Sequence, residues 1–297
     1  MDGVLVIDKP KGLTSHDVVG RLRRILNERR VGHAGTLDPM ATGVLVAMLG
    51  EATKLSGYLT LDDKSYVARV KLGVATNTLD ADGEVTQTAP LAPSWHDEHG
   101  RAHLERALAA ERARKEQVPP AFAAIKVDGQ RAYERARKGE PLELPPRSIR
   151  VMRLELTGLD VDDASLELEL TVSKGYYVRA LARDLGLALG LPAHLTALRR
   201  TASGPFTLAR AVRLEDVHRG SPMVAVGEAA RLVLPSVAVT PDGATRALHG
   251  KPLSPSSFVS EPPAACPCAW FDAEARLIAI GQRDGDTSAV LRGFRVA

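Results

Sequence analysis

A glycine-rich segment lies between two runs of apolar residues near the N-terminus, and it limits how this part of the chain can fold. The runs are VLVI (4–7) and VLVAML (44–49), which are typical of short buried strands. Between them, GHAGTLDPMATGVL (32–45) puts Asp38 directly before Pro39, a pair that disfavours helix and favours a turn. The sequence therefore predicts an irregular loop that carries one acidic residue between two buried elements.

Two interpretations of Asp38 are open at this point. In the first, Asp38 only stabilises a turn or caps a helix, as aspartate before proline commonly does. In the second, the loop is built for a ligand, and its glycines let the backbone come close to that ligand. The buried runs on both sides favour the second interpretation.

Basic residues are clustered in a chain that is almost neutral overall. The 297 residues carry a net charge of +3, with an isoelectric point near 8.9. The clusters are RLRRILNERR (21–30), RARK (112–115), RAYERARK (131–138) and the pair Arg199 and Arg200. Such clusters fit a polyanionic partner or the solvated faces of helices, and charge alone does not separate the two.

Several classes of protein are disfavoured by the composition. Cys266 and Cys268 are too few and too close together for a disulfide framework, or for a zinc site without other ligands. The N-terminus lacks the pattern of an export signal, and no run approaches 18 apolar residues. We therefore expect a cytoplasmic protein without a membrane segment or metal, and nothing in the sequence demands more than a monomer.

Periodicity predicts several further elements. Residues 15–30 have apolar positions at helical spacing behind a possible Ser15 cap, and residues 65–72 and 165–172 alternate as strands do. Helices are also expected at about 101–117 and 226–234. Short strand-like runs follow in the tail.

Polar residues gather where predicted strands end, which is where scaffolds commonly present functional groups. A guanidinium beside a buried carboxylate keeps it ionised, so a pair between Asp38 and Arg179 would supply a charged nucleophile. Tyrosine rings such as those of Tyr66 and Tyr177 can stack on a nucleobase, although a lone tyrosine is more often a packing residue. Asp80 and Asp82 are interpreted as turn residues that order a neighbouring loop.

Four long motifs, in order, resemble those of the TruB type of tRNA pseudouridine synthase. They are GVLVIDKPKGLTSHDVV (3–19), GHAGTLDPMATGVL (32–45), KSYVARVKLGVATNTLDADGEV (64–85) and SKGYYVRALARDLG (173–186). Residues 117–140 are similar to the family's thumb, which closes over RNA. Two departures are that Ala123 stands where the family's thumb motif has serine, and that the tail resembles the family's PUA-like appendage only loosely.

The resemblance implies an α+β fold with a mixed, largely antiparallel sheet flanked by helices. It implies a catalytic domain over residues 1–233, with a thumb insertion at about 117–150. A small β-rich, PUA-like domain that binds RNA would occupy residues 234–297.

The resemblance also implies roles for individual residues. Asp38 would be the nucleophile, Arg179 its ionic partner, and Tyr66 the ring that stacks on uracil and serves in proton removal from C5. The implied substrate-binding residues are Tyr177 and Leu198 in the base pocket, His33 in the gap left by the flipped base, and Lys9 and Lys54 in substrate placement.

The implied activity is conversion of the uridine at position 55 in the tRNA T loop to pseudouridine, with base flipping and without a cofactor. Whether Asp38 attacks C6 or C1′, or whether a glycal forms first, stays open. An alternative is a catalytically idle protein that binds or folds tRNA on the same scaffold. A phosphotransferase that uses Asp38 as a phosphate acceptor is weaker, because the loop lacks the Lys and Ser/Thr of a P-loop.

Overall fold

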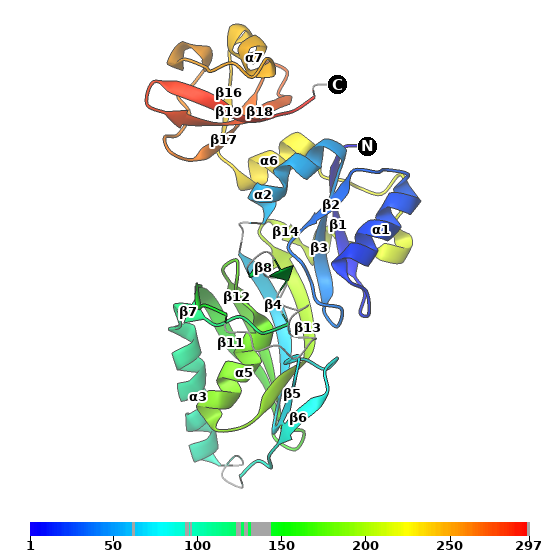
Figure 1. Cartoon of the computed structure of the whole chain (residues 1–297), viewed down its shortest axis with the longest axis vertical. Coiled ribbons are helices and arrows are strands. Elements are labelled where there is room, and N and C mark those ends of the chain that lie inside the picture. Colours follow the sequence, from blue (N-terminus) through cyan, green and yellow to red (C-terminus); the bar gives the residue numbers. More distant parts are fainter. Residues whose placement is uncertain are drawn as a thin grey trace.

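The computed structural model describes residues 1–60, 63–92, 95, 97–122, 126–127, 130–131 and 144–295. The described part of the chain is built around a nine-stranded mixed sheet and the helices that cover it (Figure 1). The sheet strands are β1 (Gly3–Lys9), β2 (Val31–Ala34), β3 (Thr42–Leu49), β4 (Lys64–Leu72), β11 (Val151–Asp160), β12 (Ser165–Val172), β13 (Ala193–Ser203), β14 (Phe206–Thr207) and β15 (Val212–Arg213).

The strands follow the order β11, β12, β4, β13, β3, β1, β15, with β14 beside β13 and β2 beside β3. Pairing is parallel between β13 and β3 and between β1 and β15, and antiparallel in the other pairs of this sheet. The expected mixed, largely antiparallel sheet is therefore confirmed. The β13–β3 junction joins two halves of the sheet, since β13 pairs along most of its length with β4.

Helices cover each half of the sheet. Helices α3 and α5 pack together on the half formed by β11, β12, β4 and β13, whereas α1 lies beside β1 and β2 (Figure 1). The helices are α1 (Ser15–Leu26), α2 (Ser56–Leu59), α3 (Glu98–Arg112), α5 (Val178–Leu189), α6 (Val226–Val233) and α7 (Pro241–Leu248), with 3-10 turns η1 (Gly50–Leu55), η3 (Leu208–Arg210), η4 (Leu214–Asp216) and η5 (Pro255–Ser257). Within the described ranges, none of the helices has the length and apolar character needed to cross a membrane.

Small two-stranded sheets decorate the large one. They are β5 (Val74–Thr76) with β6 (Val85–Thr88), β7 (Glu116–Gln117) with β10 (Arg147–Ser148), and β8 (Lys126–Val127) with β9 (Gln130–Arg131). The last two pairs belong to the predicted insertion at about 117–150. Much of that insertion, including Ala123 and the basic residues Arg135, Arg137 and Lys138, lies outside the described residues.

Three predictions from periodicity need correction. Thr14, not Ser15, caps α1. Its hydroxyl accepts a hydrogen bond from the Asp17 amide, and the Asp17 carboxylate accepts one from the Thr14 amide. Helix α3 ends at Arg112, since the chain then enters β7. The segment 32–45 is regular at both ends, because β2 pairs with β3, and the irregular part is residues 35–41.

The C-terminal region forms a separate four-stranded sheet with α7 beside it. Its strands are β16 (Ser236–Ala238), β17 (Pro267–Phe271), β18 (Leu277–Asp284) and β19 (Thr287–Gly293). An apolar cluster joins this sheet to the main one, since Phe271, Ile280 and Phe294 pack in the same cluster as side chains from β1 and β3. The C-terminal sheet is thus held against the N-terminal half of the large sheet.

Candidate active site

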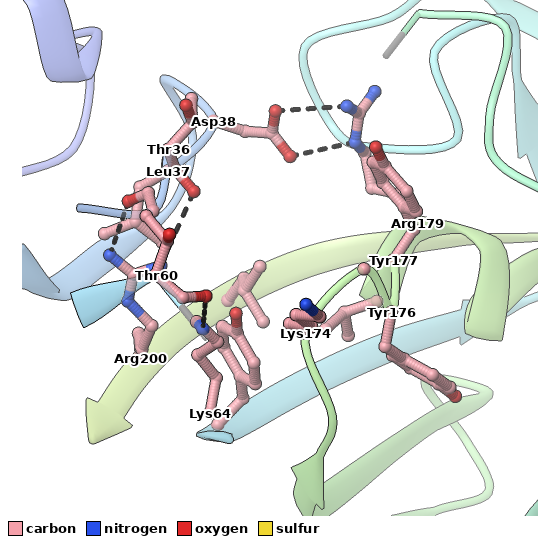
Figure 2. Close-up of a pocket in the computed structure, with 15 residues that line it drawn as sticks. Thr36, Leu37, Asp38, Thr60, Lys64, Lys174, Tyr176, Tyr177, Arg179 and Arg200 are labelled. Carbon is pink, nitrogen blue, oxygen red and sulfur yellow. Dashed lines mark hydrogen bonds and ion pairs between the residues drawn. The ribbon is translucent and has the colours of Figure 1, made fainter. Parts of the chain in front are cut away.

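A cavity of about 310 Å³ opens where the loop before β3 faces the beginning of α5. Its volume lies in the lower part of the range for small-molecule pockets. The lining combines charged groups with tyrosine and leucine side chains, and Figure 2 shows its polar members. It is lined by Gly35, Thr36, Leu37, Asp38, Thr60, Lys64, Tyr66, Lys174, Gly175, Tyr176, Tyr177, Val178, Arg179, Leu198 and Arg200.

Asp38 and Arg179 form the two-point ion pair that the sequence predicted (Figure 2). Nη2 of Arg179 donates to Oδ1 of Asp38 at 3.0 Å, and Nε lies 2.9 Å from Oδ2. The Arg179 side chain is only 7% exposed, whereas one third of the Asp38 side chain is exposed. The pair therefore holds the carboxylate in one orientation while leaving part of it open to the cavity.

Opposing effects act on the pKa of Asp38. Burial raises the pKa of its carboxyl, Arg179 opposes that rise, and the nearby Asp80 adds to it. The ionised form of Asp38 consequently depends on its contact with Arg179.

Asp80 is more than a turn residue. Its Oδ1 accepts from the Thr78 hydroxyl at 2.6 Å and from the Asp82 amide at 3.1 Å, which is the predicted turn. Its other oxygen, Oδ2, lies 3.6 Å from Nε of Arg179. Asp80 is buried and Asp82 is exposed, so only Asp80 contributes directly to the charge around Arg179.

Two carboxylates thus share one guanidinium. Arg179 also donates to the backbone carbonyls of Thr78 and Phe122, at 3.0 and 2.9 Å, which fixes its plane. Across the described residues, no group of three or more His, Cys, Asp or Glu side chains is placed to hold a metal ion.

Buried side chains hold the Asp38 loop by its backbone. Nζ of Lys9 donates to the carbonyls of Leu13 and Pro39 at 2.7 and 3.3 Å, and Ser15 bonds both the amide and the carbonyl of Leu37. Lys9 is fully buried, and burial lowers its pKa to about 8. Its ammonium group therefore links the turn after β1 to the Asp38 loop, and the prediction that Lys9 takes part in substrate placement stays a prediction.

Arg200 anchors the other end of the same loop. Its guanidinium donates to the carbonyls of Gly35, Thr36 and Val44, the first at 2.9 Å. Gly43 has a φ of +97°, and a Cβ there would lie 2.2 Å from the Arg200 carbonyl oxygen. The structure thus explains Gly43 by its close contact with β13, whereas we had expected the loop glycines to admit a ligand.

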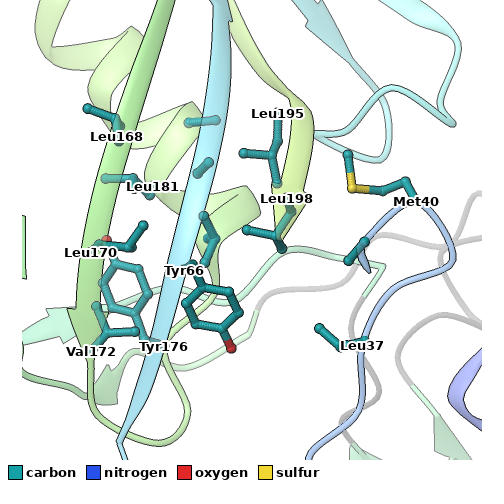
Figure 3. Close-up of a cluster of buried hydrophobic side chains, with 14 of the residues drawn as sticks. Leu37, Met40, Tyr66, Leu168, Leu170, Val172, Tyr176, Leu181, Leu195 and Leu198 are labelled. Atoms are coloured by element: carbon teal, nitrogen blue, oxygen red, sulfur yellow. The ribbon is translucent and has the colours of Figure 1, made fainter. Parts of the chain in front are cut away.

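An apolar wall completes the cavity opposite the charged pair. Tyr66, from β4, is 9% exposed, and its ring lies beside Leu198 of β13 and faces the loop residues Leu37 and Met40 (Figure 3). The Tyr177 ring lines the cavity from the residue that precedes α5. The structure therefore brings Tyr66, Tyr177 and Leu198 together with Asp38 and Arg179.

His33 lies in β2, two residues before the first lining residue of the cavity. Its ring makes an edge contact with that of His16, with centroids 5.5 Å apart. Burial lowers its pKa, and its Nδ1 is buried without a hydrogen-bond partner among the described residues. The implied role of His33, to fill the gap left by the flipped base, stays a prediction.

Lys54 lies away from the cavity, in η1. Its Nζ donates to Glu51 at 2.6 Å and to the Gly293 carbonyl at 2.7 Å, and it lies over the Phe294 ring. These contacts tie the large sheet to the C-terminal strand β19. Lys54 is not among the residues that line the cavity, and its implied part in substrate placement stays a prediction.

Sequence reasoning missed the residues that act through the backbone. From the sequence, Ser15 is only a possible helix cap, and Arg200 is only one member of a basic cluster. The sequence marks Ser15 and Arg200 in one way only: each is a polar residue next to apolar residues of a helix or strand. That signal does not identify the carbonyl each would bind.

Comparison with known proteins decides the family. A model described as "TruB family pseudouridylate synthase (N terminal domain)" matches residues 23–178, more than half of the chain, and "tRNA pseudouridylate synthase B C-terminal domain" matches residues 179–235. This chain belongs to the TruB family. Relatives named tRNA pseudouridine synthase B include one from Thermobifida fusca (strain YX), 43% identical, and one from Mycobacterium bovis (strain BCG / Pasteur 1173P2), 46% identical. The alignments cover 98% of this chain in both cases, and 98% and 96% of the respective relatives.

Solved structures support the TruB fold. A chain from a Cbf5-Nop10-Gar1 complex matches with a TM-score of 0.75 and 24% identity, covering 99% of this chain and 85% of the other. A chain from an H/ACA RNP bound to a substrate RNA containing 2′-deoxyuridine matches with a TM-score of 0.72 and 23% identity, with the same coverage. At these identities the likeness concerns the fold.

Proposed function

We propose that this TruB-family protein converts the uridine at position 55 in the T loop of tRNA to pseudouridine, with Asp38 as the nucleophile. The observation that carries the proposal is the Asp38–Arg179 pair, which directs a partly exposed carboxylate into a cavity walled by Tyr66, Tyr177 and Leu198. The names of the relatives support tRNA as the substrate.

In the proposed reaction, the target uridine leaves its stack and enters the cavity, at a cost of a few kcal/mol that is smallest for a base in a loop. The Asp38 carboxylate attacks, the bond between N1 and C1′ breaks, and the base turns. C5 then bonds to C1′, the bond to Asp38 breaks, and C5 loses a proton while N1 gains one, so that the product is an isomer of the substrate. The closed apolar wall serves to keep water away from the intermediate.

The basic residues and the C-terminal sheet have a separate task in this proposal. Contacts to phosphates set the position of an RNA without reading its sequence, so the pocket selects the base while the basic surface holds the T arm. We assign RNA binding to the C-terminal sheet on the same grounds, with the domain boundary near residue 234. A monomeric state and a cytoplasmic location also belong to the proposal.

The test is to incubate a T-arm hairpin and a full tRNA transcript with the purified protein in the presence of EDTA, and to map pseudouridine by position. We expect modification at position 55 alone. A transcript with cytidine at that position is the control for other sites. Binding without modification would favour the idle tRNA-binding alternative, and modification elsewhere would contradict the assignment to position 55.

A further inference from the structure

Gln117 makes an unusual two-point contact with the backbone of a pocket residue. Its side chain is buried, and its residue is 3% exposed. Its Oε1 accepts from the Tyr177 amide at 2.8 Å, and its Nε2 donates to the Tyr177 carbonyl at 3.3 Å. An amide side chain is suited to this contact because it carries an acceptor and a donor side by side.

Tyr177, the residue that Gln117 contacts, lies at the start of α5 beside the cavity. Tyr177 is the N-cap residue of α5, and its own side chain makes no cap hydrogen bond because its ring lines the cavity. Its carbonyl also accepts from the Leu181 amide at 3.1 Å, the first bond of the helix. The backbone of Tyr177 therefore sets the direction of its ring and of Arg179, two residues later.

Further contacts attach residues 117–122 to α5. Arg183 donates to the Val118 carbonyl at 2.8 Å, and Arg179 donates to the Phe122 carbonyl at 2.9 Å. Behind them, the buried Tyr176 hydroxyl donates to Glu111, near the end of α3. Residues 117–122 and the first turns of α5 are thus joined at several points, of which Gln117 alone holds the backbone at Tyr177.

We propose that Gln117 is a positioning residue of the pseudouridine synthase reaction, holding the backbone of Tyr177 so that the Tyr177 ring and Arg179 face Asp38 correctly. The inference rests on the proposed function. Small misplacements of reacting groups slow chemistry much more than they weaken binding. Gln117 therefore acts on the catalytic step and contributes little to the affinity for tRNA.

Two substitutions separate this role from simple packing. Gln117→Met keeps the length of the side chain and removes both hydrogen bonds. Gln117→Glu keeps the acceptor for the Tyr177 amide, but an ionised carboxylate has no proton to donate to the Tyr177 carbonyl. The protonated carboxyl group of Gln117→Glu can donate to the Tyr177 carbonyl. Burial and this hydrogen bond both favour the protonated, neutral form.

The experiment measures the single-turnover rate and the Kd for tRNA between pH 6 and pH 8. For Gln117→Met we expect a rate about ten- to a hundredfold below wild type at every pH, with the Kd within about twofold. For Gln117→Glu we expect a similar loss at pH 8 that shrinks relative to wild type as the pH falls. Glu116→Gln, at the exposed neighbouring position, is the control and should match wild type.

Wild-type rates in both Gln117 variants would overturn the inference, as would a loss in Gln117→Glu that is the same at every pH. Should Gln117→Met fail to fold, the pH series of Gln117→Glu decides alone, because it compares one variant with itself. Failure of the proposed function would look different, since the wild-type protein would then form no pseudouridine at position 55.

Discussion

Strand β3 has a carboxylate beyond each end, Asp38 before it and Glu51 after it, and the two lie in opposite electrostatic settings. Burial raises the pKa of Asp38, and the rise is opposed mainly by Arg179 and to a smaller extent by Lys9. Burial also acts to raise the pKa of Glu51, but hydrogen bonds from Lys54, the Arg295 amide and Arg30 outweigh it and lower the pKa to about 2.

The difference lies in how many donors surround each carboxylate. Glu51 accepts at 2.6 Å from Lys54, at 2.9 Å from Arg30 and at 3.0 Å from the Arg295 amide, and its side chain is 8% exposed. Asp38 is held along one edge by Arg179 and is one third exposed. A carboxylate with donors on several sides stabilises the fold, whereas one held on a single edge keeps an oxygen surface available for reaction.

The largest expected effect comes from Asp38→Asn, which keeps the shape and removes the charge. We expect pseudouridine formation to fall by about 10³-fold or more, with tRNA binding within a few-fold, because the phosphate contacts remain. Since a raised pKa means that the ionised Asp38 costs stability at neutral pH, thermal unfolding should show an unchanged or higher Tm. Substantial residual turnover would remove Asp38 from the role of nucleophile.

Arg179→Ala should impair both chemistry and folding. Asp38 and the buried Asp80 would lose their common partner, and breaking a buried pair costs about 3–5 kcal/mol. Denaturant unfolding and single-turnover rates measure the two effects. Arg276→Ala, which breaks an ion pair with Asp272 on an arginine that is half exposed, is the matched control and should cost at most about 1 kcal/mol. Equal effects in the two variants would contradict the assignment.

Glu51→Gln tests the other end of β3. We expect the free energy of unfolding at pH 7 to fall by about 1–3 kcal/mol, with turnover per folded molecule unchanged. Because the pKa of Glu51 is lowered on folding, its contribution is present above about pH 4.5 and is lost as the pH falls toward 2. The difference between variant and wild type, measured by denaturant unfolding at several pH values, should therefore shrink over that interval. If the difference in unfolding free energy grew as the pH fell, the pKa of Glu51 would not be lowered on folding.

The smallest effect is expected for Lys54→Met. Lys54 is one third exposed, so loss of its ion pair should cost about 0–1 kcal/mol. Turnover and the KM for tRNA should stay within about twofold, because its ammonium group contacts Glu51 and β19 and lies away from the cavity. A large rise in KM with unchanged stability would instead support a part for Lys54 in substrate placement.

The sequence predicted much of the frame and the central pair of the site. Alternation at residues 165–172 and the apolar run at 44–49 predicted β12 and β3, because the burial of a strand is visible in the order of its own apolar and polar residues. The contact between Asp38 and Arg179 is also as predicted, because the family resemblance implies Arg179 as the ionic partner of Asp38. The limits of α1, α3 and the Asp38 loop were less accurate, since they depend on caps and on strand partners far along the chain.

What the sequence determined by itself is the family and the kinds of residue at the pocket, because both follow from local motifs. What only the tertiary structure decided is which polar groups face the cavity and which hold the backbone. From the sequence, Lys9 and Arg200 are candidates for RNA contact, yet Lys9 binds the carbonyls of Leu13 and Pro39 and Arg200 binds that of Gly35. Lys54 links η1 to strand β19. The reason is physical: a buried cation must satisfy its hydrogen bonds with whatever carbonyls folding brings near, and that neighbourhood is not encoded at any single position.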